Sequence, residues 1–414
     1  MRKASFLSVL IILAMFITLS AWGQGKVITL KILDGQSTTD AGMEKLIDEA
    51  LAKKYPDIKL DWDIGDWGKT FQPKMQQYLQ SGLPDIMIGK GQDVPTYANL
   101  GVLANLTGKP YLKNVIPAAV GSGTVKGKVY GVVFNALYQG VYYNRKLFSD
   151  NNIHIPKTQA QLLDVINKLK SLGITPFETH FKDTWSIGNI TMQFAINDVF
   201  NKYHNWGDQF RAGKVSFATS PEYRACYMYN KLIYDNTWKD DTFSMDQIKA
   251  DTLMVQGKAG MKVSGSWSIQ NFQSVDPDFD FGIFPFPNQT GNAKLIFEPN
   301  ITIMVSKNTK YMEAVDKVIS LIIGDKELAE KIFNLTKTAS MLKKAGPTYN
   351  NPSQKDIDSY ASKNMIVDAN TGNTQLVWGG FQDQNAQDIA AWLQGQMTID
   401  QILKAADSRR SASK

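Results

Sequence analysis

The sequence predicts an α/β protein with two lobes and a mainly parallel sheet that carries helices on both faces. Two observations predict this fold class. Short apolar strands alternate with amphipathic helices from residue 27 onward, and this β-α-β-α-β order is typical of parallel sheets covered by helices. The chain also has 414 residues, which is more than a single hydrophobic core usually supports, so two lobes are expected.

The first unit of this pattern is expected within residues 27–88. Apolar residues at helical spacing between Met43 and Leu51 define one helix, which Asp40 can cap and which Tyr55-Pro56 ends. The expected elements are strand 27–33, a helix from Asp40 to Tyr55, strand 58–64, helix 70–79 and strand 84–88. Ligands of such sheets bind beyond the carboxyl ends of the strands, which here lie near Gln36, Trp67 and residues 90–93.

Further strands and helices are expected along the rest of the chain. Thr158 and Gln161 have the spacing of a capping box, Ser220-Pro221 begins another helix, and Ser244 with Gln247 cap the next. The expected elements are a hairpin at 125–129, strands 130–134, 140–144, 174–177, 259–263 and 279–284, a longer strand 296–305, helices 311–323 and 326–335, and a largely helical tail from Lys355.

The N-terminus has the layout of a secretory signal peptide over residues 1–25. Arg2 and Lys3 precede an apolar run over 6–19, and small residues from Ser20 onward offer a cleavage site. The run is short for a membrane span, although an uncleaved anchor is the alternative. Leu19-Ser20-Ala21 followed by Trp22 resembles a bacterial lipoprotein box with tryptophan in place of the lipidated cysteine. We therefore expect export without lipidation.

Composition and motif content exclude several classes of function. The net charge of +6 falls to +4 when Arg2 and Lys3 are removed with the leader, and the basic residues are not clustered, so no nucleic-acid partner is expected. Cys226 is the only cysteine, which excludes a disulfide framework and favours a buried structural thiol. The three histidines lack metal-ligand spacing, and nucleophile-elbow, zinc-helix and phosphate-loop motifs are absent, so we expect no cofactor and no metal.

Several blocks are similar to the bacterial extracellular solute-binding proteins, the family that includes the maltose-binding proteins. The segment from Gly140 to Asp150 resembles the family signature, and Gly265-Ser266-Trp267 resembles the turn that carries a ligand-stacking tryptophan. The other blocks occur in the family's order, at 83–87, 99–103, 155–158, 173–177, 256–261, 281–287 and 398–403.

This resemblance implies a two-lobed periplasmic-binding-protein fold with a ligand cleft between the lobes. Residues 27–134 plus 298–343 would form one lobe and residues 135–297 plus 344–414 the other, joined by hinges at Phe134-Asn135 and Phe297–Pro299. It further implies a non-catalytic, monomeric subunit of an ABC importer. Such a subunit is exported to the periplasm or cell surface, closes over its ligand and delivers it to the permease.

Sugar is the ligand that the candidate site residues favour. A sugar ring offers apolar C–H faces for aromatic planes, and hydroxyls for carboxylate and amide groups. The aromatic candidates are Trp267, Trp185, Trp378, Phe381 and Trp67. The polar candidates are Gln36, Gln92, Asp93, Asn135, Asp183 and Glu298, and Tyr138 borders the cleft by analogy.

Three alternatives remain open at this point. The same fold could bind a peptide, a polyamine or a tyrosine-bound metal ion. A secreted carbohydrate-active enzyme with paired carboxylates is a second alternative, because acidic residues alone do not decide the matter. A surface adhesion protein is the third.

Overall fold

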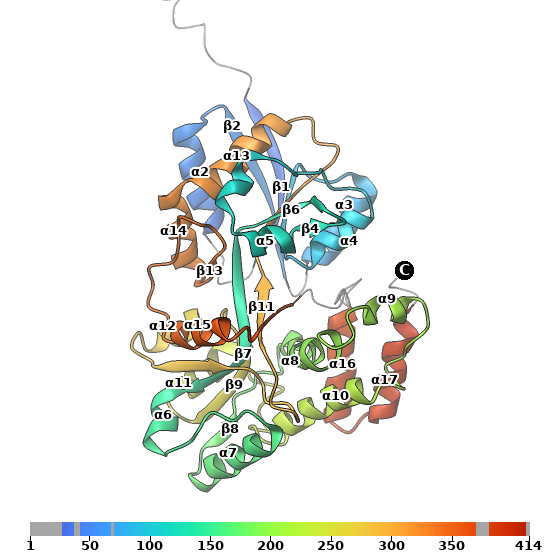
Figure 1. The fold of residues 1–414 in the computed structure, drawn as a ribbon, viewed down its shortest axis with the longest axis vertical. Coiled ribbons are helices and arrows are strands. Elements are labelled where there is room, and N and C mark those ends of the chain that lie inside the picture. The colour runs from blue at the N-terminus through green and yellow to red at the C-terminus, as the bar shows by residue number, and fades with distance from the viewer. Residues whose placement is uncertain (1–26, 37–41, 68–69, 370–380, 411–414) are drawn as a thin grey trace, which may run out of the picture.

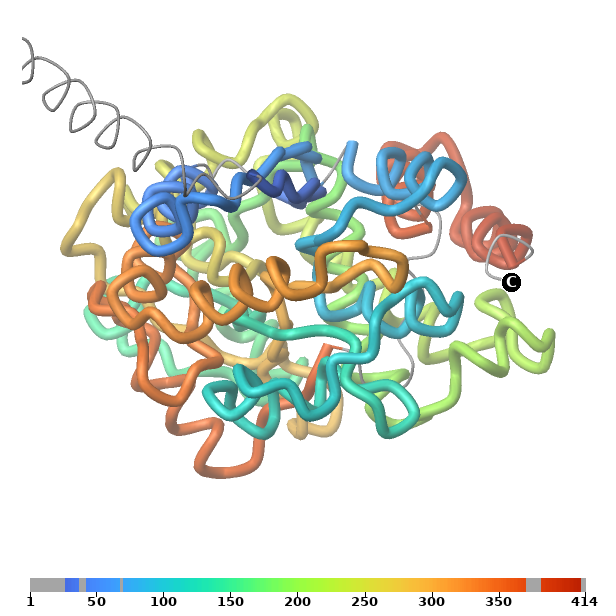
Figure 2. Tube along the Cα trace, turned by 90° about the horizontal axis from the view of Figure 1, so that it is seen from above, coloured from blue at the N-terminus to red at the C-terminus, as the bar shows by residue number. Residues whose placement is uncertain are grey.

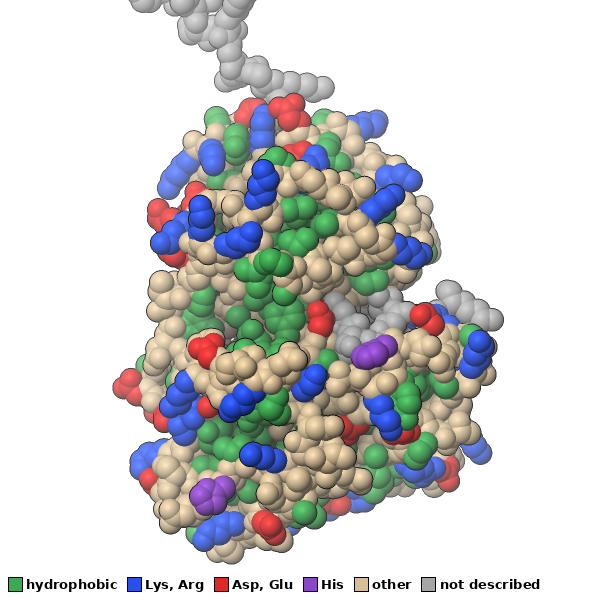
Figure 3. Space-filling model, in the orientation of Figure 1, with side chains coloured by type: hydrophobic (Ala, Val, Ile, Leu, Met, Phe, Trp, Pro, Cys, Tyr) green, Lys and Arg blue, Asp and Glu red, His purple; other side chains and the backbone are tan. Residues whose placement is uncertain are grey.

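The computed structural model describes residues 27–36, 42–67, 70–369 and 381–410. Two lobes stack along the long axis of the molecule, and the extended strands β7 (Asn135–Asn144) and β11 (Leu295–Pro299) run between them (Figure 1). Hydrophobic side chains gather along the waist where the two lobes meet (Figure 3). In the described part of the chain, no helix has both the length and the apolar character needed to cross a membrane.

The first lobe is built on a five-stranded sheet. β1 pairs in parallel with β2 and β3, as the β-α-β-α-β pattern predicts, whereas β12 is antiparallel to β3 and β6. The strand order is β2 (Ile58–Asp66), β1 (Ile28–Gln36), β3 (Ile86–Gly89), β12 (Thr302–Val305) and β6 (Gly131–Val133).

Alternate side chains of these strands reach two different cores. Ile32 and Ile88 pack with the helices of one face, and Leu33 and Met87 pack with those of the other, because successive strand residues point to opposite sides of a sheet. Helices therefore cover both faces (Figure 1). One face carries α2 (Met43–Lys54), α13 (Met312–Gly324) and α14 (Lys326–Thr336), and the other carries α3 (Phe71–Ser81) and α4 (Asp93–Asn99).

The second lobe contains a mixed sheet around β7. β9 and β10 are antiparallel to β7, while β8 is parallel to β9 and β14 is parallel to β11. The strands are β14 (Ile366–Asp368), β11, β7, β9 (Ala259–Gly265) and β8 (Thr175–Phe177), with β10 (Phe281–Phe284) also on β7. The helices are α6 (Arg145–Asp150), α7 (Gln159–Ser171), α8 (Trp185–Ala195), α9 (Trp206–Arg211), α10 (Pro221–Tyr234), α11 (Gln247–Val255), α12 (Ser268–Val275), α15 (Gln354–Ser362), α16 (Phe381–Leu393) and α17 (Ile399–Ser408).

The C-terminal helices belong to the second lobe. α16 lies against α8 and α10, and α17 lies at the outer edge of the molecule (Figures 1 and 2). Cys226 is fully buried in the same core, as expected, and burial raises the pKa of its thiol well above the ordinary value. The thiol therefore acts as a small apolar side chain.

One buried amide joins the segments that cross between the lobes. Asn135 follows β6 at the start of β7, and its Oδ1 accepts a hydrogen bond from the backbone N–H of Ile301 at 2.7 Å. Its Nδ2 donates to Thr338 Oγ1 at 2.7 Å, next to the short strand β13 (Ala339–Ser340), which pairs with β7. Three chain segments that are far apart in sequence thus meet at a single side chain.

The expected long strand 296–305 is wrong, because the chain changes sheets within it. β11 ends at Pro299 after pairing with β7, and β12 begins at Thr302 in the sheet of the first lobe.

Two expected helix caps are also wrong. α2 begins after Gly42, whose φ of 101° suits glycine, and Asp40 lies outside the described residues. Asp246, rather than Ser244, caps α11 by accepting from Lys249 N–H. The Thr158–Gln161 capping box and the Ser220 cap are confirmed.

Candidate ligand-binding site

Two predicted tryptophans meet at the inner end of the second lobe. Trp267 follows β9, Trp185 is the first residue of α8, and their ring centroids lie 6.0 Å apart at an interplanar angle of 73°. A Cβ on Gly265 would come within 2.1 Å of the Trp267 ring, so only glycine leaves room for this ring against the strand end. The two half-buried rings form an aromatic corner, a term used below for Trp185 and Trp267.

The first lobe presents a similar arrangement at the carboxyl end of its sheet. Trp67 follows β2, and its ring lies so close to Gly35 that a Cβ there would approach it to 2.2 Å. Phe71 packs against Trp67 with ring centroids 4.7 Å apart. Lys90 Nζ also lies 5.4 Å from the Trp67 ring centroid, within the range of a cation–π interaction.

A chain of polar side chains runs from Lys90 across the hinge to α8. Lys90 Nζ lies 3.2 Å from Glu298 Oε1 on β11, and Gln139 Nε2 on β7 donates to Glu298 Oε2. Gln139 Oε1 accepts from Asn189 Nδ2 at 3.1 Å. Asn189 Oδ1 then accepts from Gln193 Nε2 at 2.9 Å. We call these five residues the polar relay.

The carboxylate of Asp93 supports the first-lobe end of the relay. Its Oδ2 accepts a hydrogen bond from Lys90 N–H at 2.8 Å, which orders the turn between β3 and α4. Burial raises the pKa of Asp93 to about 6, against the lowering effect of that hydrogen bond and of the nearby Lys90 charge.

The other polar candidates are engaged within the protein to different degrees. Gln36 donates to Glu44 Oε2 at 2.9 Å, and Asp183 Oδ2 accepts from Gln247 N–H at 3.3 Å. Gln92 is half-buried just before α4. The Tyr138 ring packs edge-on against Phe297 at 6.0 Å, and burial raises the pKa of its hydroxyl.

Two candidates lie away from any exposed surface. Asn135 is fully buried, and its amide braces the crossing segments. Phe381, at 2% exposure, belongs to the second-lobe core and stacks on Phe217 at 5.4 Å. In this arrangement both contribute packing rather than a cleft surface. Trp378 lies outside the described residues.

Sequence reasoning missed Lys90, Gln139, Asn189 and Gln193. A signal for two of them was present, because Trp185, Asn189 and Gln193 are spaced four residues apart and so share one face of α8. Their neighbours Ile187, Ile190 and Phe194 are buried in the core. Polar residues that lie four and eight positions after an aromatic candidate in an otherwise apolar helix indicate that this face of the helix lines a polar site.

A buried charged cluster lies behind the aromatic corner. Lys262 on β9 is 1% exposed, and its Nζ lies 3.2 Å from the Glu178 carboxylate and in direct contact with Asp251. His180 Nδ1 lies 3.3 Å from Glu178 Oε1, and the His180 ring packs edge-on against Trp185 at 5.5 Å. We call Glu178, His180, Asp251 and Lys262 the buried cluster.

The charge states within this cluster follow from its contacts. Burial alone would raise the pKa of Glu178, but the charge of Lys262 and the contact with His180 hold it below the ordinary value. Burial raises the pKa of Asp251, and the Glu178 charge adds to that effect. Burial alone would lower the pKa of Lys262, but its two carboxylate partners raise it. Both carboxylates thus contact the Lys262 ammonium, and Glu178 is the one whose pKa is lowered.

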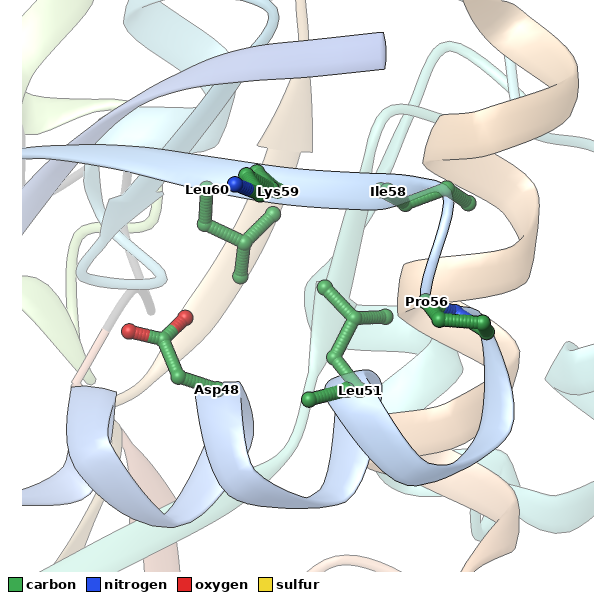
Figure 4. Close-up of a pocket in the computed structure, with 7 residues that line it drawn as sticks. Asp48, Leu51, Pro56, Ile58, Lys59 and Leu60 are labelled. Carbon is green, nitrogen blue, oxygen red and sulfur yellow. The ribbon is translucent and has the colours of Figure 1, made fainter. Parts of the chain in front are cut away.

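A separate hollow of about 240 Å³ lies between α2 and β2 on the first lobe (Figure 4). Its lining includes Leu51, Ile58 and Leu60, with Asp48 as the acidic member. Asp48 already accepts hydrogen bonds from Trp62 Nε1 at 3.1 and 3.3 Å. Because it contains none of the aromatic or relay residues, this hollow is not the candidate site. The described residues also include no group of three or more His, Cys, Asp or Glu side chains that could hold a metal ion.

Comparison with known proteins assigns the class. Residues 34–329 match the family model of the bacterial extracellular solute-binding proteins, and the chain belongs to this family. This membership confirms the predicted class, a binding protein rather than an enzyme, and implies that the protein is exported.

Individual relatives agree with this assignment. The chain is 23% identical over 303 residues to the multiple sugar-binding protein of Streptococcus mutans, covering 70% of each protein. It is 25% identical over 357 residues to an uncharacterized ABC transporter extracellular-binding protein of Pyrococcus horikoshii, covering 81% of this chain and 76% of that one. Among solved structures, a sugar transporter protein of Bacillus licheniformis in complex with stachyose superposes with a TM-score of 0.77 at 17% identity, over 94% of this chain and all of that one. The last similarity confirms the two-lobed fold.

Proposed function

We propose that this protein binds a sugar or oligosaccharide between its lobes and delivers it to the permease of an ABC importer. The observation that carries the proposal is the aromatic corner of Trp185 and Trp267 beside the polar relay, with Trp67 at the facing end of the first lobe. Tryptophan planes match the apolar faces of sugar rings, and amide and charged groups match their hydroxyls. The names of relatives that bind sugars and serve ABC transporters support the same substrate class and partner.

The electrostatics of the site favour a neutral ligand. A polyamine requires carboxylates that are free to meet its ammonium groups, but Glu298 already pairs with Lys90. A metal ion held by tyrosines requires deprotonated phenols, but burial raises the pKa of both Tyr138 and Tyr142. Uncharged hydroxyls, by contrast, exchange hydrogen bonds with amides without a net change in charge.

We further propose that residues 27–134 plus 298–343 and residues 135–297 plus 344–414 close on the ligand as two lobes. The separate sheets and cores support this division, and the crossing segments near Asn135 and Glu298 would be the hinges. Bending at such interlobe segments is the usual mode of closure in binding proteins of this shape. We propose a monomer, exported through a signal peptide at residues 1–25.

Calorimetry of the mature protein against stachyose, raffinose and maltotriose tests this proposal. At least one sugar is expected to bind with a roughly micromolar Kd, about −8 kcal/mol, and to be recovered chemically unchanged. The variant Trp267→Ala should weaken binding by about 2–4 kcal/mol, as for a residue at the centre of an interface.

Trp62→Ala is the matched control, because Trp62 lies beside the α2–β2 hollow and not at the aromatic corner. Its affinity should equal that of the wild type. Hydrolysis of a sugar by the purified protein, or equal losses in the two variants, would contradict the proposal.

A further inference from the structure

Two polar ring atoms that flank Trp185 lack a partner within the described part of the chain. His180 is 4% exposed, and its Nε2 has no hydrogen-bond partner among the described residues. The Nε1 of Trp267 is buried and equally unpartnered there. A buried polar atom without a hydrogen bond costs about 1–3 kcal/mol. Two such atoms beside one candidate binding surface therefore indicate groups that a ligand satisfies.

The two atoms have complementary roles. An indole Nε1–H can only donate, and a neutral imidazole has one donating and one accepting nitrogen. The Glu178 carboxylate lies 3.3 Å from His180 Nδ1, and an ionised carboxylate can only accept. A neutral His180 therefore carries its proton on Nδ1, which leaves a lone pair on Nε2.

Glu178 can hold this tautomer because the buried cluster keeps it ionised. Lys262 lies 3.2 Å from its carboxylate, and this charge holds the pKa of Glu178 below the ordinary value despite burial. Asp251 is the carboxyl of the cluster whose pKa is raised by burial and by the Glu178 charge. Glu178 is thus a positioning residue that acts through His180, and Lys262 positions Glu178 in turn.

We propose that His180 and Trp267 recognise two different hydroxyls of a sugar bound at the aromatic corner. His180 Nε2 accepts a hydrogen bond from one hydroxyl, and Trp267 Nε1 donates to the oxygen of another. Ring centroid distances of 5.5 Å from Trp185 to His180 and 6.0 Å from Trp185 to Trp267 put both groups in contact with the same tryptophan of the aromatic corner. This inference rests on the proposed function and adds its hydroxyl specificity.

The first test needs no ligand. The chain contains three histidines, so a protein labelled with ¹⁵N-histidine gives three imidazole spin systems, and His180→Gln identifies the one from residue 180. Long-range proton–nitrogen spectra of the sugar-free wild type are expected to show a protonated Nδ1 and a bare Nε2 for His180. The opposite tautomer, or an imidazolium with both nitrogens protonated, would overturn the inference, because Nε2 could not accept.

The second test separates hydrogen bonding from stacking. Trp267→Phe keeps an aromatic ring but removes the indole N–H, and His180→Phe keeps a flat ring but removes both nitrogens. Each variant is expected to weaken the tightest-binding sugar among stachyose, raffinose and maltotriose roughly tenfold. The matched controls Trp62→Phe and His204→Phe should bind like the wild type, since Trp62 is distant from the corner and His204 is exposed.

The outcomes distinguish this inference from the proposed function. If Trp267→Phe and His180→Phe bind the sugar as tightly as the wild type does, the proposed hydroxyl contacts are wrong and the proposed function still stands. A failure of all three sugars to bind the wild type would contradict the proposed function and this inference together. Circular dichroism checks that each variant is folded, and the tautomer of the wild type decides the role of His180 even if His180→Phe does not fold.

Discussion

Replacing Glu298 with glutamine is expected to destabilise the protein by about 2–3 kcal/mol. The Glu298 side chain is 5% exposed and pairs with Lys90, whose side chain is 27% exposed. Removing one partner of a fully buried ion pair costs about 3–5 kcal/mol, and the partial exposure of Lys90 reduces that figure. The new amide N–H₂ would also face a donor in either orientation, which is the Lys90 ammonium or the N–H₂ of Gln139.

The second effect reaches beyond Glu298 itself. Gln139 could rotate its amide to face the new donor with its oxygen, but Asn189 Nδ2 would then lose the acceptor that it contacts at 3.1 Å. One carboxylate-to-amide change therefore leaves Lys90, Gln139 or Asn189 without the acceptor that it now has. The consequence should extend to α8 and so to ligand affinity.

Urea unfolding followed by circular dichroism measures this loss, with Asp150→Asn as the matched control. Asp150 pairs with Lys146 on the surface, with side chains 54% and 78% exposed, and exposed pairs of this kind contribute about 0–1 kcal/mol. The same chemical change is made in both variants. A loss of stability for Glu298→Gln no larger than that for Asp150→Asn would refute the relay as a structural link between the lobes.

Three further predictions concern a titration, the hinge and the N-terminus. Burial raises the pKa of Asp93 to about 6 from 3.8, so between these pH values the folded state holds a proton that the unfolded state releases. The stability of the wild type relative to Asp93→Asn should therefore fall as pH rises from about 4 to 6, by at most about 3 kcal/mol. A difference in unfolding free energy that stays constant across that range would contradict this. Asn135→Ala should lower the free energy of unfolding by about 2–4 kcal/mol, because in a fully buried position Ile301 N–H loses its acceptor and the Thr338 hydroxyl loses one of its hydrogen bonds. An unchanged urea midpoint would show that the crossing segments do not depend on Asn135. Trp22→Cys should convert the exported protein into an acylated form that partitions into detergent, since acyl chains add about 0.8 kcal/mol of membrane affinity per buried CH₂. Mass spectrometry that finds an acylated N-terminus on the unchanged Trp22 protein would contradict this prediction.

Local patterns in the sequence predicted most of the helices and strands of the first lobe. The apolar stripe from Met43 to Leu51 and the strands at 27–33 and 84–88 correspond to α2, β1 and β3. The error at 296–305 has a different origin. Both β11 and β12 are apolar, so their composition gives no sign that the chain leaves one sheet at Pro299 and enters another at Thr302. Sheet membership depends on partners that are far away in sequence.

The sequence predicted some residues of the candidate site and missed others. Trp267 was identified because Gly265-Ser266-Trp267 resembles the family's turn with a ligand-stacking tryptophan. Trp185 and Trp67 were identified because they lie after a strand or open a helix where the resemblance places the cleft. Lys90 and Gln139 were not identified, because their importance comes from Glu298, which lies 208 and 159 residues further along the chain.

The sequence by itself determined the class of this protein, most of its α/β elements and the aromatic residues of its candidate site. These depend on periodicity, on turn chemistry and on blocks that resemble one family, all of which are local. Only the tertiary structure decided which polar groups are paired with each other and which remain for a ligand. Asn135 changed from a candidate ligand contact to a brace between crossing segments because both ends of its amide are satisfied. His180 became a candidate hydroxyl acceptor because Glu178 engages only one of its nitrogens. Hydrogen-bond satisfaction is a property of the folded surroundings of a side chain, and two residues of the same type in similar local sequences can therefore differ in it completely.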